Sequence, residues 1–182
     1  MEAIQQQNFK PFAIPVKMGL LIAGLKIVLA YIQYSMFLSD WMISMLITFI
    51  SFCLGIGLLV YTGILQRKAL GGFIDIKQGF QAMFVAILVM VVLINTFDFI
   101  YAQYIDPDMV VKIKDSAIAK AEQFGAPQET LDDMAIRFDE QNAGKANFGK
   151  ILLGYLSSIV LYSIVGIIIA AAISKKKPLE IA

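Results

Sequence analysis

Residues 41–65 read WMISMLITFISFCLGIGLLVYTGIL, an uninterrupted stretch without a charged side chain. A helix needs about 20 predominantly apolar residues to cross the hydrocarbon core of a bilayer. Three other stretches meet this requirement, at about 18–38, about 80–101 and about 151–173. The sequence therefore predicts an all-α integral membrane protein with four transmembrane helices.

Composition agrees with this prediction. The chain has 182 residues, of which 59% are hydrophobic and 16% charged, and its mean hydropathy is +0.75. Soluble domains are typically about 45–50% apolar and about 25% charged. We expect residues 1–182 to form a single membrane domain in contact with membrane lipids. The net charge of +1 gives no reason to expect a nucleic-acid partner.

Lysine and arginine gather on one side of the predicted spans. They lie before the first span, in the second connection and in the tail: Lys10, Lys17, Arg67, Lys68, Lys77, Lys175, Lys176 and Lys177. The other side has the short Ser39–Asp40 connection and an acid-rich segment at 105–142. By the positive-inside rule, both termini are expected in the cytoplasm of a bacterium, with the chain crossing its inner membrane four times.

The segment 105–142, between the third and fourth spans, is expected to form an extracytoplasmic (periplasmic) amphipathic helical hairpin. Asp106 can cap a helix that begins at Pro107, Gly125 can end it, and Pro127 can open the next. Apolar residues recur at helical spacing on both helices: Val110, Ile113, Phe124, Leu131, Met134 and Phe138. These stripes either pack on each other and on the spans, or dock a periplasmic partner.

Three polar residues within the spans are candidate functional groups. Lys26 lies roughly 12 Å into the bilayer, where a lysine costs about 2.5–3.5 kcal/mol. Asn95 and Asp98 are its available partners, although Asp98 should lie about 10–15 Å farther along the membrane normal. Three interpretations of Lys26 stay open: its amine extends to the headgroups, makes a structural contact inside the bundle, or forms a transport or lipid-headgroup site.

Two spans carry small residues at helix-packing spacing. They are Ser44, Thr48, Ser51 and Gly55 in the second span, and Gly154, Ser158, Gly166 and Ala170 in the fourth. Small side chains let membrane helices approach closely. The packing partner is either another span of the same chain or a second copy in a homo-oligomer.

Candidate catalytic groups are scarce. The chain has one cysteine and no histidine. The absence of histidine removes the commonest general base and the commonest metal ligand. Cys53 lies in an apolar run and is expected to be a buried, unreactive thiol. We therefore expect no catalytic, cofactor-binding or metal-binding residues, and no enzymatic activity.

Two motifs suggest a family. Residues 17–25 read KMGLLIAGL and residues 71–80 read GGFIDIKQGF, and they accompany the acidic connection with its Gly125-Ala-Pro break and the lysine-rich tail. The chain resembles the DUF4199 family, small membrane proteins of unknown function found mainly in Bacteroidota. The resemblance implies no cofactor and no catalytic residue. Genes of this family often lie near one for a polyprenol-phosphate sugar transferase, which suggests either such a glycosyltransferase as a partner or a shared pathway.

Two functions remain open. The first is a non-enzymatic inner-membrane accessory or scaffold subunit of a cell-envelope process, with other membrane or periplasmic proteins as partners. The second is a small transporter or polyprenyl-phosphate lipid-carrier translocator that uses Lys26, Asn95 and Asp98. Substitution of Lys26 by leucine separates them, because only the second function needs its charge.

Overall fold

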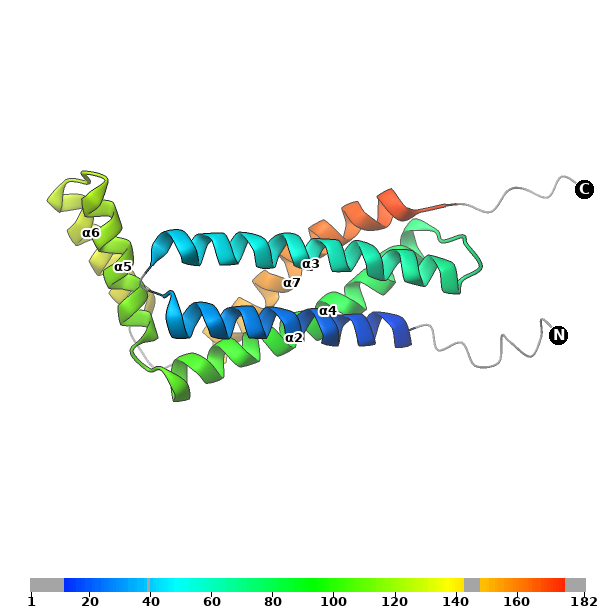
Figure 1. The fold of residues 1–182 in the computed structure, drawn as a ribbon, viewed down its shortest axis with the longest axis horizontal. Coiled ribbons are helices and arrows are strands. Elements are labelled where there is room, and N and C mark those ends of the chain that lie inside the picture. Colours follow the sequence, from blue (N-terminus) through cyan, green and yellow to red (C-terminus); the bar gives the residue numbers. More distant parts are fainter. Residues whose placement is uncertain (1–11, 39, 143–147, 176–182) are drawn as a thin grey trace, which may run out of the picture. The chain divides into compact units, whose positions relative to one another are not determined.

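A computed structural model describes residues 12–38, 40–142 and 148–175 of the chain. Lys10, Ser39, Lys176 and Lys177 lie outside these residues. The described chain is helical and has no strand. Its elements are α2 (Ala13–Met36), α3 (Trp41–Ala69), α4 (Ile76–Ile100), the π-helical turn η2 (Tyr101–Ile105), α5 (Met109–Gln123), α6 (Gln128–Asn142) and α7 (Phe148–Ile173) (Figure 1).

Four of these helices are long and apolar enough to cross a membrane: α2, α3, α4 continued by η2, and α7. The prediction of an all-α chain with four membrane-spanning helices is confirmed. Helix α4 begins at Ile76, earlier than the apolar run, because Asp75 and Gln78 cap each other. The Gln78 N–H donates to Asp75 Oδ1 at 2.7 Å, and the Asp75 N–H donates to Gln78 Oε1 at 3.3 Å.

The chain forms two compact units, and each of the four long helices contributes residues to both. Unit 1 comprises Met1–Gly24, Leu54–Leu93 and Ser157–Ala182, and unit 2 comprises Leu25–Cys53 and Ile94–Leu156.

Unit 1 contains most of the buried apolar side chains, including Ile22, Leu59, Met83, Ile87 and Ala170. Glycines bring its helices close together. A Cβ at Gly19 would lie 2.7 Å from the Ala86 carbonyl oxygen, and one at Gly79 would lie 3.3 Å from Ala170 Cβ. The α2–α4 and α4–α7 contacts therefore depend on backbone approach at glycine.

One end of unit 1 is closed by main-chain hydrogen bonds. Gly71 and Gly72 have φ values of +80° and +91° and turn the chain between α3 and α4. Ile74 then exchanges two hydrogen bonds with Lys175, of 3.0 and 2.8 Å, just after α7. These bonds join the α3–α4 connection to the end of the last span.

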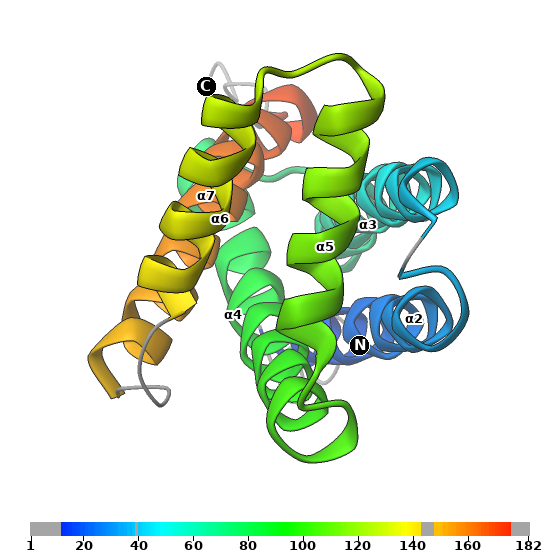
Figure 2. The same ribbon diagram turned by 90° about the vertical axis from the view of Figure 1, so that its left-hand side faces the viewer.

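In unit 2, α5 and α6 lie side by side, and α5 is the nearer of the two to α2 and α3 (Figure 2). Lys114 Nζ and Asp139 Oδ1 form an ion pair of 2.9 Å between them. Gly125, with φ +78°, follows the end of α5 as expected. The predicted start of α5 was wrong: the helix begins at Met109, because the Asp106 carboxylate binds Lys112 Nζ at 2.7 Å instead of capping.

The expectation that Cys53 is buried was also wrong. Its side chain is exposed on α3, as are the neighbouring Phe52 and Leu54. In a helix that crosses a membrane, apolar residues can face lipid, so an apolar run does not imply burial within the protein.

Candidate functional site

A polar seam joins α2 to α3 in unit 2. Gln33 Nε2 donates hydrogen bonds to Ser44 Oγ at 2.7 Å and to Thr48 Oγ1 at 3.2 Å. Thr48 Oγ1 in turn donates to the Ser44 carbonyl oxygen at 2.9 Å. The predicted packing residues Ser44 and Thr48 are therefore hydrogen-bonded to a glutamine on the neighbouring helix.

Lys26 continues the seam. Its Nζ donates to the Ser51 carbonyl oxygen at 3.4 Å, and its side chain is half-buried. Ser44 and Ser51 are about 10 Å apart along α3 at 1.5 Å per residue. Here "polar seam" denotes Lys26, Gln33, Ser44, Thr48 and Ser51. This geometry matches the bundle contact among the three interpretations of Lys26.

Asp98 is held by an aromatic cluster. The Tyr34 hydroxyl donates to Asp98 Oδ1 at 3.1 Å. The ring centre of Tyr34 lies 5.1 Å from that of Tyr101, and the ring centre of Tyr101 lies 5.8 Å from that of Phe97. The side chain of Tyr101 is buried, with 3% of its surface exposed. The Tyr34 hydroxyl of α2 therefore supplies a hydrogen bond to a carboxylate that would otherwise lie among apolar groups.

Asn95 lies one turn before Asp98 on α4. Its Nδ2 atom is buried and makes no hydrogen bond within the described residues. The structure thus places all three polar candidates in unit 2. Lys26 donates a hydrogen bond to the Ser51 carbonyl oxygen, and Asp98 accepts one from Tyr34.

The end of α4 is a π-helical turn. The Asp106 N–H donates to the Tyr101 carbonyl oxygen, five residues back, at 2.8 Å. Such turns are frequent at functional sites. Here the turn begins with Tyr101, which contacts Tyr34, and it precedes α5, so it links the aromatic cluster to that helix.

A cleft lies between α5 and the α2–α3 connection, made of two adjoining cavities of about 360 and 590 Å³. We call it the interfacial cleft. The smaller cavity is lined by Gln33, Tyr34, Leu38, Trp41, Ser44, Met109, Ile113, Ser116 and Ala117. The larger is lined by Met36, Asp40, Trp41, Met42, Ser116, Ala119, Lys120 and Gln123. Trp41 and Ser116 border both cavities.

Lys120 is positioned by two aromatic rings. Its Nζ lies 5.2 Å from the ring centre of Trp41 and 5.1 Å from that of Phe124, and it donates to Gln123 Oε1 at 2.9 Å. The two rings contact each other edge to face at 6.5 Å. Cation–π contact restrains the ammonium group at the cleft.

Asp40 provides the opposite charge. Its Oδ1 accepts the N–H groups of Met42 and Ile43, both at 3.1 Å, and so caps α3. The larger cavity is thus lined by one acidic and one basic side chain.

Two more lysines of α5 form ion pairs outside the cleft. A hydrogen bond to Asp106 raises the pKa of Lys112, and one to Asp139 raises the pKa of Lys114. Because these pKa values are raised above 10.5, both interactions are present at neutral pH and are lost as the pH rises through the raised values.

The remaining predicted helix-packing residues lie partly at contacts between helices and partly on the surface. Gly55 is buried, Ser158 is half-buried, and a Cβ at Gly166 would lie 3.0 Å from Ile87 Cδ1. Gly154 is exposed, with no atom within 4 Å of its Cβ position.

The apolar residues of 105–142 that were predicted to dock a partner also divide into buried and exposed side chains. Leu131 is 5% exposed and Phe124 is 75% exposed, while Ile113 lines the cleft. Val110, Met134 and Phe138 are half-buried.

Tyr34, Trp41 and Lys120 were not among the site residues predicted from the sequence. Two spacings could have indicated them. Gln33 and Tyr34 follow Lys26 by two helical turns, which places them on its face. Lys120 lies on α5 four residues before Phe124, the residue that follows this helix, and a lysine is unexpected at this spacing from an apolar residue.

No group of three or more acidic or cysteine side chains able to hold a metal ion occurs in the described part of the chain. The fold and the site define a multi-pass helical membrane protein with a polar seam and a cleft beside its spans. Residues 17–175 match the family described as "Protein of unknown function (DUF4199)", and the chain belongs to this family. Neither a curated protein nor a solved structure shows significant similarity to the chain.

Proposed function

We propose that the protein is a non-enzymatic accessory or scaffold subunit of a cell-envelope process in a bacterial inner membrane. The observation that supports this role is the apolar surface of α5 and α6, which lie outside the four spans. Val111 and Ile136 are large apolar residues, 50% and 56% exposed. Exposed apolar side chains on helices outside the spans suit contact with another protein.

The proposed orientation has both termini in the cytoplasm and α5–α6 in the periplasm. Its support is the distribution of charge. Unit 1 carries Lys17, Arg67, Lys68, Lys77 and Lys175, whereas in residues 105–142 of unit 2 the acidic residues outnumber the bases Lys112, Lys114, Lys120 and Arg137. Basic residues near span ends favour the cytoplasmic side. The α5–α6 surface would then meet a periplasmic protein or the periplasmic face of a membrane protein.

The test is co-purification from native membranes in mild detergent. The double variant Val111→Ser and Ile136→Ser should release a protein that co-purifies with the unaltered chain, such as a polyprenol-phosphate glycosyltransferase. A matched control, Val111→Leu with Ile136→Leu, keeps both positions apolar and should retain the partner. An identical set of co-purifying proteins for all three chains would contradict the scaffold proposal.

The polar seam favours a second candidate, a small transporter or polyprenyl-phosphate lipid-carrier translocator. Gln33 and Ser44 belong both to the seam and to the lining of the interfacial cleft. The seam therefore leads from the cleft to Lys26, which would offer a positive charge to a phosphate. Asn95 and Asp98 would line the same path.

Lys26→Leu separates the two candidates. A translocator should lose its function in cells that depend on it, whereas a scaffold should keep it at an equal protein level. Lys26→Arg retains the charge and is the control. Normal function of Lys26→Leu would exclude a translocator that uses this charge.

A further inference from the structure

The interfacial cleft lies where a helix that crosses the membrane meets the headgroup region. Trp41, at the start of α3, is 41% exposed and borders both cavities. Tryptophan is enriched at this depth of a bilayer, where its ring is apolar and its N–H is hydrated. A ligand in the cleft would therefore share its environment with lipid headgroups.

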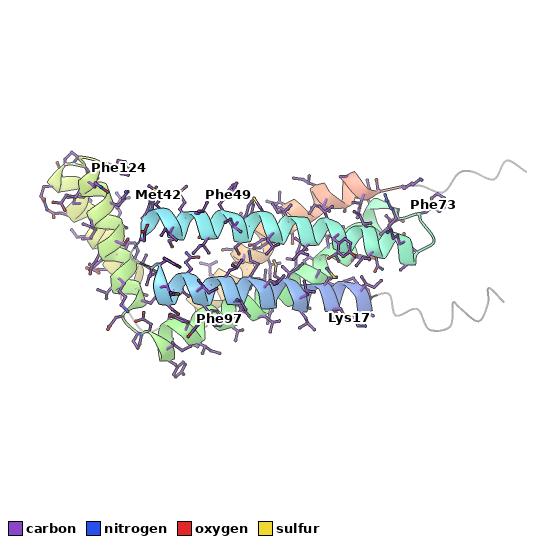
Figure 3. All side chains as sticks on the ribbon, viewed as in Figure 1. Lys17, Met42, Phe49, Phe73, Phe97 and Phe124 are labelled. Atoms are coloured by element: carbon purple, nitrogen blue, oxygen red, sulfur yellow. The ribbon has the colours of Figure 1, made fainter. Side chains whose placement is uncertain are left out.

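The lining of the larger cavity includes two exposed methionines. Met36 and Met42 are 72% and 69% exposed. Met45 and Phe49 continue the exposed apolar surface along α3, at 59% and 63% exposure. Figure 3 shows Met42 and Phe49 projecting from α3. A molecule with its polar part in the cavity could lay hydrocarbon chains along this surface.

The charges inside the larger cavity are balanced. Lys120 is held over Trp41 and Phe124, and Asp40 is held by the main-chain N–H groups at the start of α3. Both side chains are thus restrained before any ligand arrives. A ligand with one negative and one positive group complements this pair, whereas a purely anionic headgroup would bring a second negative charge to Asp40.

We propose that the interfacial cleft binds a zwitterionic phospholipid that carries a primary ammonium group, of the phosphatidylethanolamine class. The phosphate lies against Lys120, the ammonium group donates to Asp40, and the acyl chains run past Met36 and Met42. The cavity of about 590 Å³ is within the range of small-molecule sites, about 300–1,000 Å³. This site does not depend on the accessory role and would serve either proposed function.

Native mass spectrometry of the delipidated full-length protein tests the proposal. The probes are phosphatidylethanolamine and phosphatidylglycerol with identical acyl chains, titrated separately. Phosphatidylethanolamine should bind roughly tenfold more tightly, the difference expected for one charge-assisted contact.

Two charge variants locate the site. Lys120→Gln should weaken phosphatidylethanolamine binding roughly tenfold. Asp40→Asn should remove the preference over phosphatidylglycerol while keeping the cap, because asparagine is an equally good N-cap. Lys112→Gln removes a charge from α5 outside the cleft and is the control that should bind normally.

A third variant tests occupancy of the cavity without a change of charge. Ala119→Trp places a bulky side chain at an exposed lining position and should abolish binding. Thermal unfolding of each variant in detergent verifies that it is folded. Equal binding of both lipids, a preference for phosphatidylglycerol, or unchanged binding by Lys120→Gln and Ala119→Trp would overturn the proposal.

Discussion

Single polar residues in the spans are hydrogen-bonded to neighbouring helices. Gln33 binds two hydroxyl groups of α3, and Tyr34 binds the carboxylate of α4. Interhelical hydrogen bonds in membranes contribute about 0.6 kcal/mol on average and about 1.7 at most. These contacts therefore specify which faces meet more than they stabilise the bundle.

The substitutions Tyr34→Phe and Asp98→Asn test the hydrogen bond between these two side chains. Because each residue is the other's hydrogen-bond partner, the two changes in unfolding free energy should be non-additive by about 0.5–2 kcal/mol. The measurement is a double-mutant cycle by reversible unfolding in mixed micelles. Tyr104→Phe removes a hydroxyl from a side chain that is 76% exposed and is the control. Additive effects of the pair would contradict the contact.

Among the secondary-structure elements, the helices of unit 1 pack through glycine, whereas α2 and α3 of unit 2 meet through polar groups. Gly19 and Gly24 lie on the same helix and appear equivalent in the sequence. A Cβ at Gly19 would meet the main chain of α4, but one at Gly24 has no atom within 4 Å. Their roles differ because only one faces another helix.

Gly19→Ala should therefore destabilise the protein by about 1–3 kcal/mol, the usual cost of overpacking. Gly24→Ala should be neutral or stabilise by up to about 1 kcal/mol, because alanine favours the helix. Both are measured as unfolding free energies in the same detergent. Equal effects of the two substitutions would show that α2 and α4 do not approach at Gly19.

At the scale of the whole molecule, the four spans and the charge distribution predict one orientation. The connection between α3 and α4 should be cytoplasmic and α5 periplasmic. The single cysteine allows a direct test, since Cys53→Ala yields a background without thiols.

In that background, Glu122→Cys on α5 should react with a membrane-impermeant maleimide in intact cells. Lys68→Cys, at the end of α3, should react only after the membrane is permeabilised. Both positions are exposed, so accessibility to solvent does not distinguish them. The opposite labelling pattern would reverse the proposed orientation.

The number of spans, their approximate ends and the family were all predictable from the amino-acid sequence. Hydropathy is a local property, summed over consecutive residues, and a bilayer makes it decisive because the backbone must form helices there. The turn at Gly71–Gly72 and the end of α5 at Gly125 were predictable for a similar reason: each depends on the conformational freedom of its own residue.

Which polar groups meet and where a cleft forms depend instead on how the helices pack in three dimensions. Lipid and a neighbouring helix are equally apolar, so hydropathy does not tell which face of a span contacts protein. The exposed Cys53, the open position of Gly154 and the pairing of Asp98 with Tyr34 all depend on helix rotation and crossing. Trp41, Asp40 and Lys120 likewise line one cleft only because α5 lies across the start of α3.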